Sequence, residues 1–376
     1  MQQENNISLN FTGDISFTGV FRNPVINNFE VFDKKILDSF NKADFNIVNL
    51  EGPTTNKKTF FRNDGLVNSP INSIAYLKQR NINVFNLANN HLFDNGPEGY
   101  KDTIKAINNN KCLSFGGGVN LKEASNAISL NKNGLSIALI GVCHKEGMIA
   151  KTNTPGIFCI ENNFELLRKI VANLKEKHDW VIINYHGGEE YTQIPMPSRR
   201  ALLRKMTTTN ADIIIAHHSH TFQGYEVYNS KPIFYSLGNF IFDIPPHKNI
   251  NFINQSAILN FKFLKNRFSF NFLPIEIDIK HGKIITGNPD FLNTIKELSK
   301  KITTNYIKNW KKDAHRTFFN AQKQITNPNI SKIGKRHQSI GKLLFSKDTF
   351  YKFYRLLKSK NKRPLFLGAL MYKISK

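Results

Sequence analysis

The amino-acid sequence predicts an α/β layered domain over roughly its first 245 residues. Five short apolar runs recur along this part of the chain, and each ends in a cluster of polar residues. The runs lack a strict alternation of apolar and polar residues, which is typical of strands buried on both faces of a sheet. They are ISLNFTGD (7–14), FNIVNLEG (45–52), INVFNLANNH (82–91), VIINYHGG (181–188) and DIIIAHHSH (212–220).

Helical periodicity lies between these runs. Apolar residues recur at helical spacing from Pro70 to Arg80 and again from Phe164 to Lys177. Strands that alternate with helices predict helices layered on a sheet. In such folds ligands bind where strands end and loops begin. The polar residues at the strand ends are therefore the first candidates for a functional site.

The pattern changes after Asp243. The stretches 256–263, 267–279 and 283–286 alternate or run apolar with short turns between them, which predicts a β-meander. From about residue 291 the chain becomes rich in lysine and helical in pattern. We therefore predict a domain at residues 1–290 and a basic, mainly helical extension at residues 291–376.

The formal net charge of +24 is concentrated near the C-terminus. Residues 296–376 contain 21 Lys and Arg but only three Asp and Glu, which predicts an anionic partner. Aromatic and leucine residues interleave with cations in 349–360, which favours peripheral contact of residues 296–376 with an anionic membrane. Docking onto a protein partner or onto the domain itself is the alternative. Nucleic acid is the least favoured partner, because no nucleic-acid-binding motif accompanies the charge.

Three features of the sequence indicate the cellular compartment of the protein. The cysteines Cys112, Cys143 and Cys159 have no metal-site or redox spacing, and an odd, sparse set suits buried thiols in a reducing compartment. The first residues lack the basic and apolar regions of a signal peptide. No stretch reaches the roughly 18 apolar residues of a transmembrane helix. We therefore expect a cytoplasmic protein, bound at most peripherally to the inner face of the membrane.

The strand ends deliver two acids, an amide and several imidazoles. Carboxylates can bridge two ions, imidazole suits Mn, Zn or Fe, and an amide completes the coordination without adding charge. Each residue alone is weak evidence, because a histidine at a strand end is more often a hydrogen-bonded structural residue. Together the five ends predict one or two divalent transition metal ions. The residues are Asp14, Ser16, Glu51, Asn90, His91, His186, His217, His218 and His220.

Six motifs occur in an order that resembles the CapA family of bacterial capsule-synthesis proteins, which are associated with poly-γ-glutamate and other capsule polymers. They are GD (13–14), NLEGP (49–53), LANNHLFDNG (87–96), YHGGEEY (185–191), AHHSHTFQG (216–224) and YSLGNFIFD (235–243). The resemblance covers about residues 7–290. It implies the fold of the calcineurin-like metallophosphoesterases, a four-layer α/β/β/α sandwich with metals at one edge.

The resemblance also implies a role for each matching residue. Glu51 stands where the superfamily has its bridging carboxylate, and His91 matches the imidazole that protonates a leaving group. An HxH sequence at a strand end places the imidazoles of His218 and His220 on one side, because side chains alternate with period 2. His217 then points away, as a supporting or structural residue. The implied metal ligands are Asp14, Glu51, Asn90, His186, His218 and His220.

Ser16 departs from the phosphoesterase pattern, in which the first motif is Asp-x-His. The departure implies that one metal is weakly held or absent. Glu190 and Tyr191 match family positions and either line a substrate pocket or form an ordinary polar rim. Asn239 either hydrogen-bonds a group behind the ligands or caps a strand end.

Three arginines, Arg199, Arg200 and Arg204, follow Pro197 in a helical pattern. We expect a solvated basic face on this helix, with binding of an anionic substrate as the alternative.

Two functions are compatible with these features. In the first, the chain is a metal-dependent hydrolase that acts on a phosphoester or related bond during synthesis of poly-γ-glutamate or an acidic exopolysaccharide. In the second, it is a non-catalytic scaffold of the same fold that binds an anionic capsular polymer, its precursor or subunits of a polymer synthase. The ligand set favours the first, whereas Ser16 and the basic extension favour the second.

Overall fold

The computed structural model describes residues 5–57, 67–244, 247, 250, 252–325, 364, 367 and 368, with side chains described as far as residue 317 in the last long helix. Two β-sheets lie at its centre. The first sheet has the strand order β16 (Lys283–Thr286), β15 (Phe268–Asp278), β14 (Gln255–Phe263), β1 (Ile7–Ile15), β2 (Phe45–Leu50), β3 (Val84–Asn86) and β4 (Leu113–Phe115), with β13 (Asn239–Ile241) paired to the end of β1. The second has the order β11 (Phe222–Tyr228), β12 (Lys231–Leu237), β10 (Ile213–His217), β9 (Trp180–His186), β7 (Leu135–Cys143) and β6 (Ile128–Lys132).

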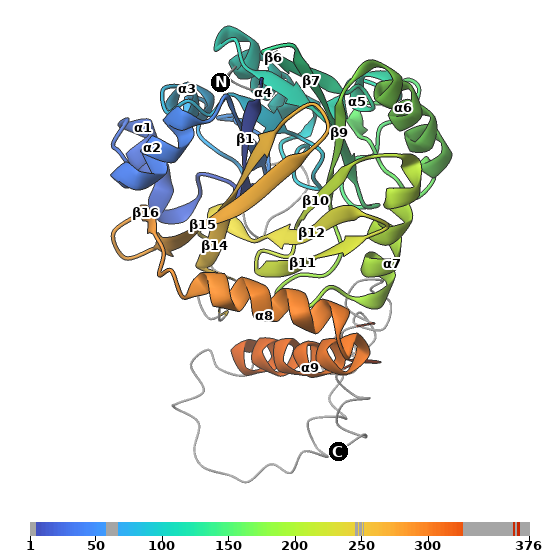
Figure 1. The fold of residues 1–376 in the computed structure, drawn as a ribbon. Coiled ribbons are helices and arrows are strands. Elements are labelled where there is room, and N and C mark those ends of the chain that lie inside the picture. Colours follow the sequence, from blue (N-terminus) through green and yellow to red (C-terminus); the bar gives the residue numbers. More distant parts are fainter. Residues whose placement is uncertain are drawn as a thin grey trace.

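Helices cover the outer face of each sheet (Figure 1). Against the first sheet pack α1 (Arg22–Ile26), α2 (Lys34–Lys42), α3 (Ser73–Lys78) and α4 (Gly96–Asn109), with the short η1 (Gly19–Phe21). Against the second pack α6 (Phe164–Lys177) and α7 (Pro197–Met206), which continues as η2 (Thr207–Thr209). Smaller elements are α5 (Leu121–Ala124) and the strand pair β5 (Gly117–Gly118) and β8 (Gly156–Ile157).

Two apolar clusters hold these layers together. Ile47 and Val48 are neighbours on β2, yet Ile47 belongs to the cluster shared with the second sheet and Val48 to the cluster under α1–α4. This division follows from the alternation of side chains along a strand. The predicted four-layer α/β/β/α sandwich is confirmed, and so is the meander, which forms β14, β15 and β16.

Strand direction brings the candidate site residues to one edge. Strands β1 to β4 are parallel, and so are β7, β9, β10 and β12. Asp14 lies opposite Asn49 in the register of β1 and β2, and His217 lies opposite His186 in the register of β10 and β9. Both sheets therefore deliver their polar strand ends to the same region.

Two further helices follow the meander, α8 (Phe291–Thr303) and α9 (Tyr306–Ile325). The ring of Phe291 meets that of Phe222 on β11 edge to face, with centroids 5.4 Å apart. Ile295 and Trp310 belong to the same apolar cluster as the two sheets. The domain boundary at residue 290 stays a prediction, but α8 and the first half of α9 pack on the sandwich.

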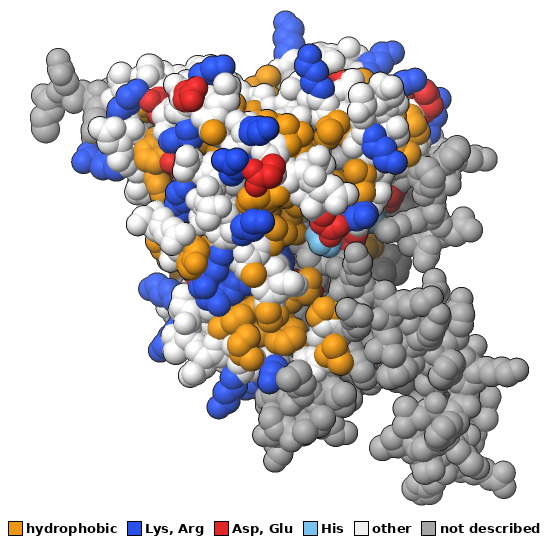
Figure 2. All heavy atoms as spheres, turned by 90° about the vertical axis from the view of Figure 1, so that its right-hand side faces the viewer, with side chains coloured by type: hydrophobic (Ala, Val, Ile, Leu, Met, Phe, Trp, Pro, Cys, Tyr) orange, Lys and Arg blue, Asp and Glu red, His pale blue; other side chains and the backbone are white. Residues whose placement is uncertain are grey.

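The three cysteines are buried and free, as expected. In the part of the chain that the structure describes, no helix combines the length and the apolar character needed to cross a membrane. Most of the basic extension, including the stretch 349–360, lies outside the described residues. On the face shown in Figure 2, lysine and arginine side chains are scattered and do not gather in one patch.

Candidate metal centre

Asp14 lies fully buried near the end of β1. Its position depends on Gly13, because a Cβ there would lie 2.0 Å from the carbonyl oxygen of Gly238. This close approach lets the Asp14 amide donate to that carbonyl at 2.9 Å. On the other side Asn49 Nδ2 donates to Asp14 Oδ1 at 2.8 Å, and Asn86 Nδ2 donates to Asn49 Oδ1 at 2.9 Å. Side-chain amides on two adjacent strands, β2 and β3, therefore support the carboxylate.

Glu51 follows β2 and is also fully buried. Neither of its carboxylate oxygens has a hydrogen-bond partner among the described residues. Burial, together with the negative charge of Asp14, raises the pKa of Glu51 well above its ordinary value. A buried carboxylate without a donor is costly unless a cation compensates it. Ligand atoms of Asp14, Glu51 and His186 lie within 4.8 Å of one another, a spacing that suits a metal ion.

Two further predicted ligands, Asn90 and His218, lie beside the ring of His186. Asn90 Oδ1 lies 2.9 Å from His186 Nε2, and His218 Nδ1 lies 3.1 Å from the same nitrogen. Burial and the neighbouring histidines lower the pKa of both His186 and His218 well below the ordinary value. Both rings are therefore neutral at pH 7, which is the form that binds metal ions.

His220 approaches the two carboxylates. Its Nε2 lies 3.8 Å from Glu51 Oε1, and its Nδ1 lies 3.6 Å from Asp14 Oδ2. Asn239 Oδ1 lies 2.9 Å from His220 Nδ1, so Asn239 hydrogen-bonds a predicted ligand from behind. A second group of ligands thus lies beside the one around His186.

The strand-based explanation of the HxH motif is wrong. Strand β10 ends at His217, and His218 and His220 have φ values of 93° and 58° in the left-handed region. Non-glycine residues rarely adopt such values, and they cluster at functional sites. The left-handed turn, rather than period 2, brings both imidazoles to the site. His217 Nδ1 lies 3.4 Å from Asp14 Oδ1, beside the predicted ligand rather than among the ligand atoms around His186.

His91 forms a dyad with a residue that the sequence analysis did not select. Its Nδ1 lies 2.6 Å from Asp94 Oδ2, and its Nε2 lies 3.7 Å from Glu51 Oε1. The i, i+3 spacing of His91 and Asp94 within LANNHLFDNG is the signal that could have identified the pair. A carboxylate of this kind orients an imidazole and stabilises its protonated form.

The remaining predicted residues border these ligands. Ser16 Oγ is buried without a hydrogen-bond partner among the described residues. The ring of Tyr191 stacks on His220 at 5.9 Å between centroids, and burial together with the charge of Glu190 raises the Tyr191 pKa. Tyr191 has a φ of 65°, a third left-handed residue beside the centre. Glu190 is partly exposed, at the rim.

The three arginines of α7 do not form a solvated face. Arg199 is 2% exposed, and its guanidinium contacts Glu189 Oε1 at 3.4 Å, the carbonyl oxygen of His217 at 3.1 Å and that of Tyr235. Arg200 and Arg204 form ion pairs with Glu226 at 3.0 and 2.6 Å. The acids lie far from the arginines in sequence, so helical periodicity alone could not reveal them.

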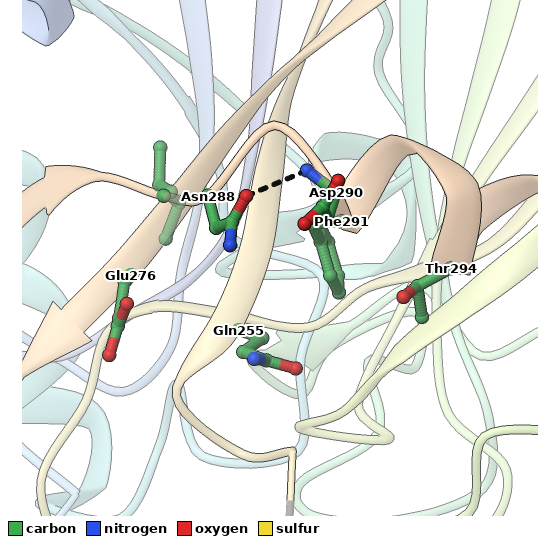
Figure 3. Close-up of a pocket in the computed structure, with 8 residues that line it drawn as sticks. Gln255, Glu276, Asn288, Asp290, Phe291 and Thr294 are labelled. Carbon is green, nitrogen blue, oxygen red and sulfur yellow. Dashed lines mark hydrogen bonds between the residues drawn. The ribbon is translucent and has the colours of Figure 1, made fainter.

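A small cavity lies elsewhere, between β14, β15 and the start of α8 (Figure 3). Gln255, Glu276 and Thr294 line it, and Asp290 donates its amide to Asn288 Oδ1 at 2.9 Å beside it. None of the predicted ligands lines this cavity.

The donor set therefore fits divalent metal ions: two carboxylates, an amide oxygen and three imidazoles, with no hydrogen-bond partner for either Glu51 oxygen among the described residues. The ligands come from both sheets, so a metal ion bound here would join the two halves of the sandwich.

Comparison with known proteins adds to this geometry. The family model described as bacterial capsule synthesis protein PGA_cap matches residues 8–244. The PGA biosynthesis protein CapA of Bacillus subtilis (strain 168) is 35% identical over 244 residues, 63% of this chain and 63% of that protein. The capsule biosynthesis protein CapA of Bacillus anthracis is 29% identical over 312 residues, 80% of this chain and 74% of that protein. Among solved structures, a 5′-nucleotidase precursor from Thermus thermophilus has 12% identity and a TM-score of 0.39, covering 80% of this chain and 59% of that one.

The alignment thus spans just under two thirds of the B. subtilis protein, at 63% of its length. The family match includes every predicted ligand from Asp14 to His220 and covers more than half of the chain. The resemblance seen in the motifs is confirmed: the chain belongs to the PGA_cap family of bacterial capsule synthesis proteins.

Proposed function

We propose that this chain is a metal-dependent hydrolase of capsule synthesis. It would cleave a phosphoester or a related bond during production of poly-γ-glutamate or an acidic exopolysaccharide. Family membership supports the biological role. The observation that carries the chemistry is Glu51, whose buried carboxylate has no hydrogen-bond partner among the described residues and lies within a set of metal-binding donors.

Two groups of ligands would hold one or two ions of Mn, Zn or Fe. Bound metal would polarise the scissile group and lower the pKa of an attacking water. Glu51 would serve both groups, because its carboxylate lies within 4.8 Å of a His186 ligand atom and 3.8 Å from His220 Nε2. Ser16 offers only a hydroxyl at a position where an imidazole would add a strong ligand. The group formed by Asp14 and His220 therefore has fewer strong ligands than it would have with a histidine at position 16. The ligands are Asp14, Glu51, Asn90, His186, His218 and His220.

His91 is the proposed general acid. In the proposed reaction a water oxygen would bond to phosphorus and release one proton to solvent, the ester P–O bond would break, and His91 would give its own proton to the departing oxygen. Asp94 accepts the hydrogen bond of Nδ1 at 2.6 Å and stabilises the imidazolium, which leaves Nε2 to deliver the proton. Tyr191 and Glu190 would border the substrate.

The test is hydrolysis of bis(p-nitrophenyl) phosphate by protein loaded with Mn or Zn. General acid catalysis contributes about 10²–10⁴-fold, so His91→Ala should lower turnover by that factor and leave the metal content unchanged. The matched control is His281→Ala, because the His281 side chain is 62% exposed and pairs with Asp278, which is not a predicted ligand. Equal turnover in wild type and His91→Ala would remove His91 from the mechanism.

A non-catalytic scaffold is the second candidate, and Ser16 is the observation that favours it. A centre with fewer ligands can hold two loops together without activating water. This function requires that metal-loaded protein cleave no ester, anhydride or polymer bond in a broad screen while it still binds an anionic capsular polymer.

We further propose that the partners are the capsular polymer or its precursor and subunits of its synthase, reached at the inner face of the membrane. The charge of residues 296–376 supports contact with an anionic surface. One contact within the extension supports the alternative of docking: a Cβ on Gly368 would lie 2.6 Å from Trp310 of α9, which itself packs on the sandwich.

A further inference from the structure

His247 lies against the metal centre, three residues beyond the end of the family match. Its imidazole is 4% exposed. The ring centroid is 4.7 Å from that of His220, 5.3 Å from that of Phe242 and 5.6 Å from that of Tyr191. It is thus packed among a predicted ligand and two aromatic side chains, and none of the six motifs includes it.

The hydrogen bonds of Asn239 with the rings of His220 and His247 determine which ring nitrogen of His247 carries the proton. Asn239 Oδ1 lies 2.9 Å from His220 Nδ1, and a carbonyl oxygen can only accept, so His220 Nδ1 carries a hydrogen. The Asn239 amide nitrogen then faces His247 Nδ1 at 3.4 Å and donates to it. Because His247 Nδ1 accepts this hydrogen bond it carries no hydrogen, so the ring is neutral and holds one proton. That proton must lie on Nε2.

The same arrangement suits the metal centre. A His220 ring with its proton on Nδ1 would bind a metal ion through Nε2, which lies 3.8 Å from Glu51 Oε1. His247 Nε2 is the opposite case, because a protonated nitrogen donates a hydrogen bond and does not ligate a metal. This nitrogen is buried and has no hydrogen-bond partner among the described residues. Buried donors of this kind normally have an acceptor.

We propose that His247 is a substrate-binding residue whose Nε2–H donates a hydrogen bond to an anionic oxygen of the substrate. The identity of that oxygen as a phosphoryl oxygen rests on the proposed function. The hydrogen-bonded series from His220 through Asn239 to His247 holds the donor in the correct tautomer. One residue, Asn239, thereby orients both a metal ligand and a substrate contact.

The tautomer is tested first, on the full chain with ¹⁵N-labelled histidine. Long-range ¹H–¹⁵N spectra distinguish the two neutral tautomers, and the His247 signals are assigned from their loss in His247→Phe. We expect the Nε2–H form in wild type and a mixture of forms in Asn239→Ala. An Nδ1–H form in wild type would overturn the proposal, whether or not the protein binds metal.

The second test measures binding of inorganic phosphate to Mn-loaded protein by calorimetry. His247→Phe keeps a ring but removes the donor, and we expect about 10- to 100-fold weaker binding, the usual effect of one hydrogen bond to a charged group. His247→Gln, which keeps an N–H, and the control His281→Phe should bind phosphate within a few-fold of wild type.

Metal content, measured on the same samples, distinguishes the possible failures. Unchanged phosphate binding in His247→Phe overturns the proposal and leaves the proposed function intact. Loss of metal from a folded His247→Phe also overturns it, because the residue would then belong to the metal centre. A wild-type protein that takes up Mn but binds no phosphate contradicts the substrate contact alone. One that takes up no metal contradicts the proposed function.

Discussion

The Asp313 carboxylate of α9 accepts a 2.7 Å hydrogen bond from the backbone amide of Gln193, which precedes it by 120 residues. Four residues further along α9, Thr317 donates to the carbonyl oxygen of Tyr191 at 3.1 Å. Because Tyr191 stacks on His220, α9 holds the segment between β9 and α7 against the metal centre. A helix beyond the family match therefore supports the candidate metal centre.

This contact predicts a specific loss of stability. Asp313 Oδ2 also accepts the amide of Ile194 at 2.9 Å, and both contacts are buried. Asp313→Ala would leave two buried amides without an acceptor, and we expect a loss of about 1–3 kcal/mol in the free energy of unfolding. Asp313→Asn keeps one acceptor oxygen and should lose less. Urea denaturation measures both, with the exposed Lys312→Ala as the control. Equal stability of all three variants would contradict the role of this contact.

The metal centre predicts about one or two equivalents of transition metal per chain. Replacing His218 and His220 together with Ala should remove most of it, because each group of ligands loses an imidazole. Elemental analysis after incubation with Mn and Zn measures the content, and His281→Ala should retain the wild-type value. A folded wild-type protein that stays metal-free would refute the centre.

The dyad makes a prediction of its own. Asp94→Asn removes the charge that stabilises a protonated His91 and keeps the size of the side chain. Residues that orient a catalytic or ligating imidazole are commonly worth about 10- to 100-fold. We therefore expect a fall of that size in turnover, smaller than that of His91→Ala, with metal content unchanged. Turnover equal to wild type would show that Asp94 does not orient the acid.

The carboxyl group of Glu226 predicts how the free energy of unfolding changes with pH. Burial acts to raise its pKa, but hydrogen bonds from Arg204, Tyr235 and Arg200 outweigh burial, and the folded-state pKa lies below the ordinary value of 4.5. A carboxyl with a lowered folded pKa contributes stability above its unfolded pKa and loses it as the pH falls through the folded pKa. The difference in unfolding free energy between wild type and Glu226→Gln should therefore be largest near pH 7 and shrink below about pH 4.5. A pH-independent difference would assign the effect to packing alone.

The sequence predicted the strand ends well for a physical reason. Parallel strands place their carboxyl ends at one edge, so Asp14, Glu51 and His186 could be grouped before their distances were known. The left-handed turn at His218 could not be predicted, because its φ depends on contacts with residues far away in the chain. His91 and Asp94 were within reach of sequence reasoning, since they lie three residues apart.

Contacts between distant segments account for most of what was missed. The burial of Arg199 depends on Glu189 and on the carbonyl oxygens of His217 and Tyr235, none of which helical periodicity reveals. The same holds for α9, whose lysine-rich sequence indicated a separate extension although its buried face meets the sandwich. Patterns of period 3.6 identify a helix and its apolar side, but not the surface that this side covers.

The last prediction separates the two parts of the basic extension. Residues 326–376 carry 13 Lys and Arg and one Asp, whereas α8 and α9 contribute Phe291, Ile295, Leu298 and Trp310 to the core. A chain ending at residue 325 should keep its metal and its cooperative unfolding. It should no longer sediment with anionic vesicles, because each cation near such a surface contributes roughly 1 kcal/mol.

Binding of the full chain to those vesicles should weaken as salt rises, since the Debye length is about 8 Å at physiological ionic strength. Neutral vesicles are the control, and equal binding to them would exclude electrostatic attachment.

A second chain, ending at residue 290, tests the domain boundary. It lacks the buried residues of α8 and α9, so we expect a lower free energy of unfolding than in the chain ending at 325. Equal stability of the two would support a boundary at residue 290 and show that these helices only rest on the sandwich. If the chain ending at 325 still sediments with anionic vesicles as the full chain does, the membrane contact lies in the sandwich or in α8 and α9, and residues 326–376 serve another partner.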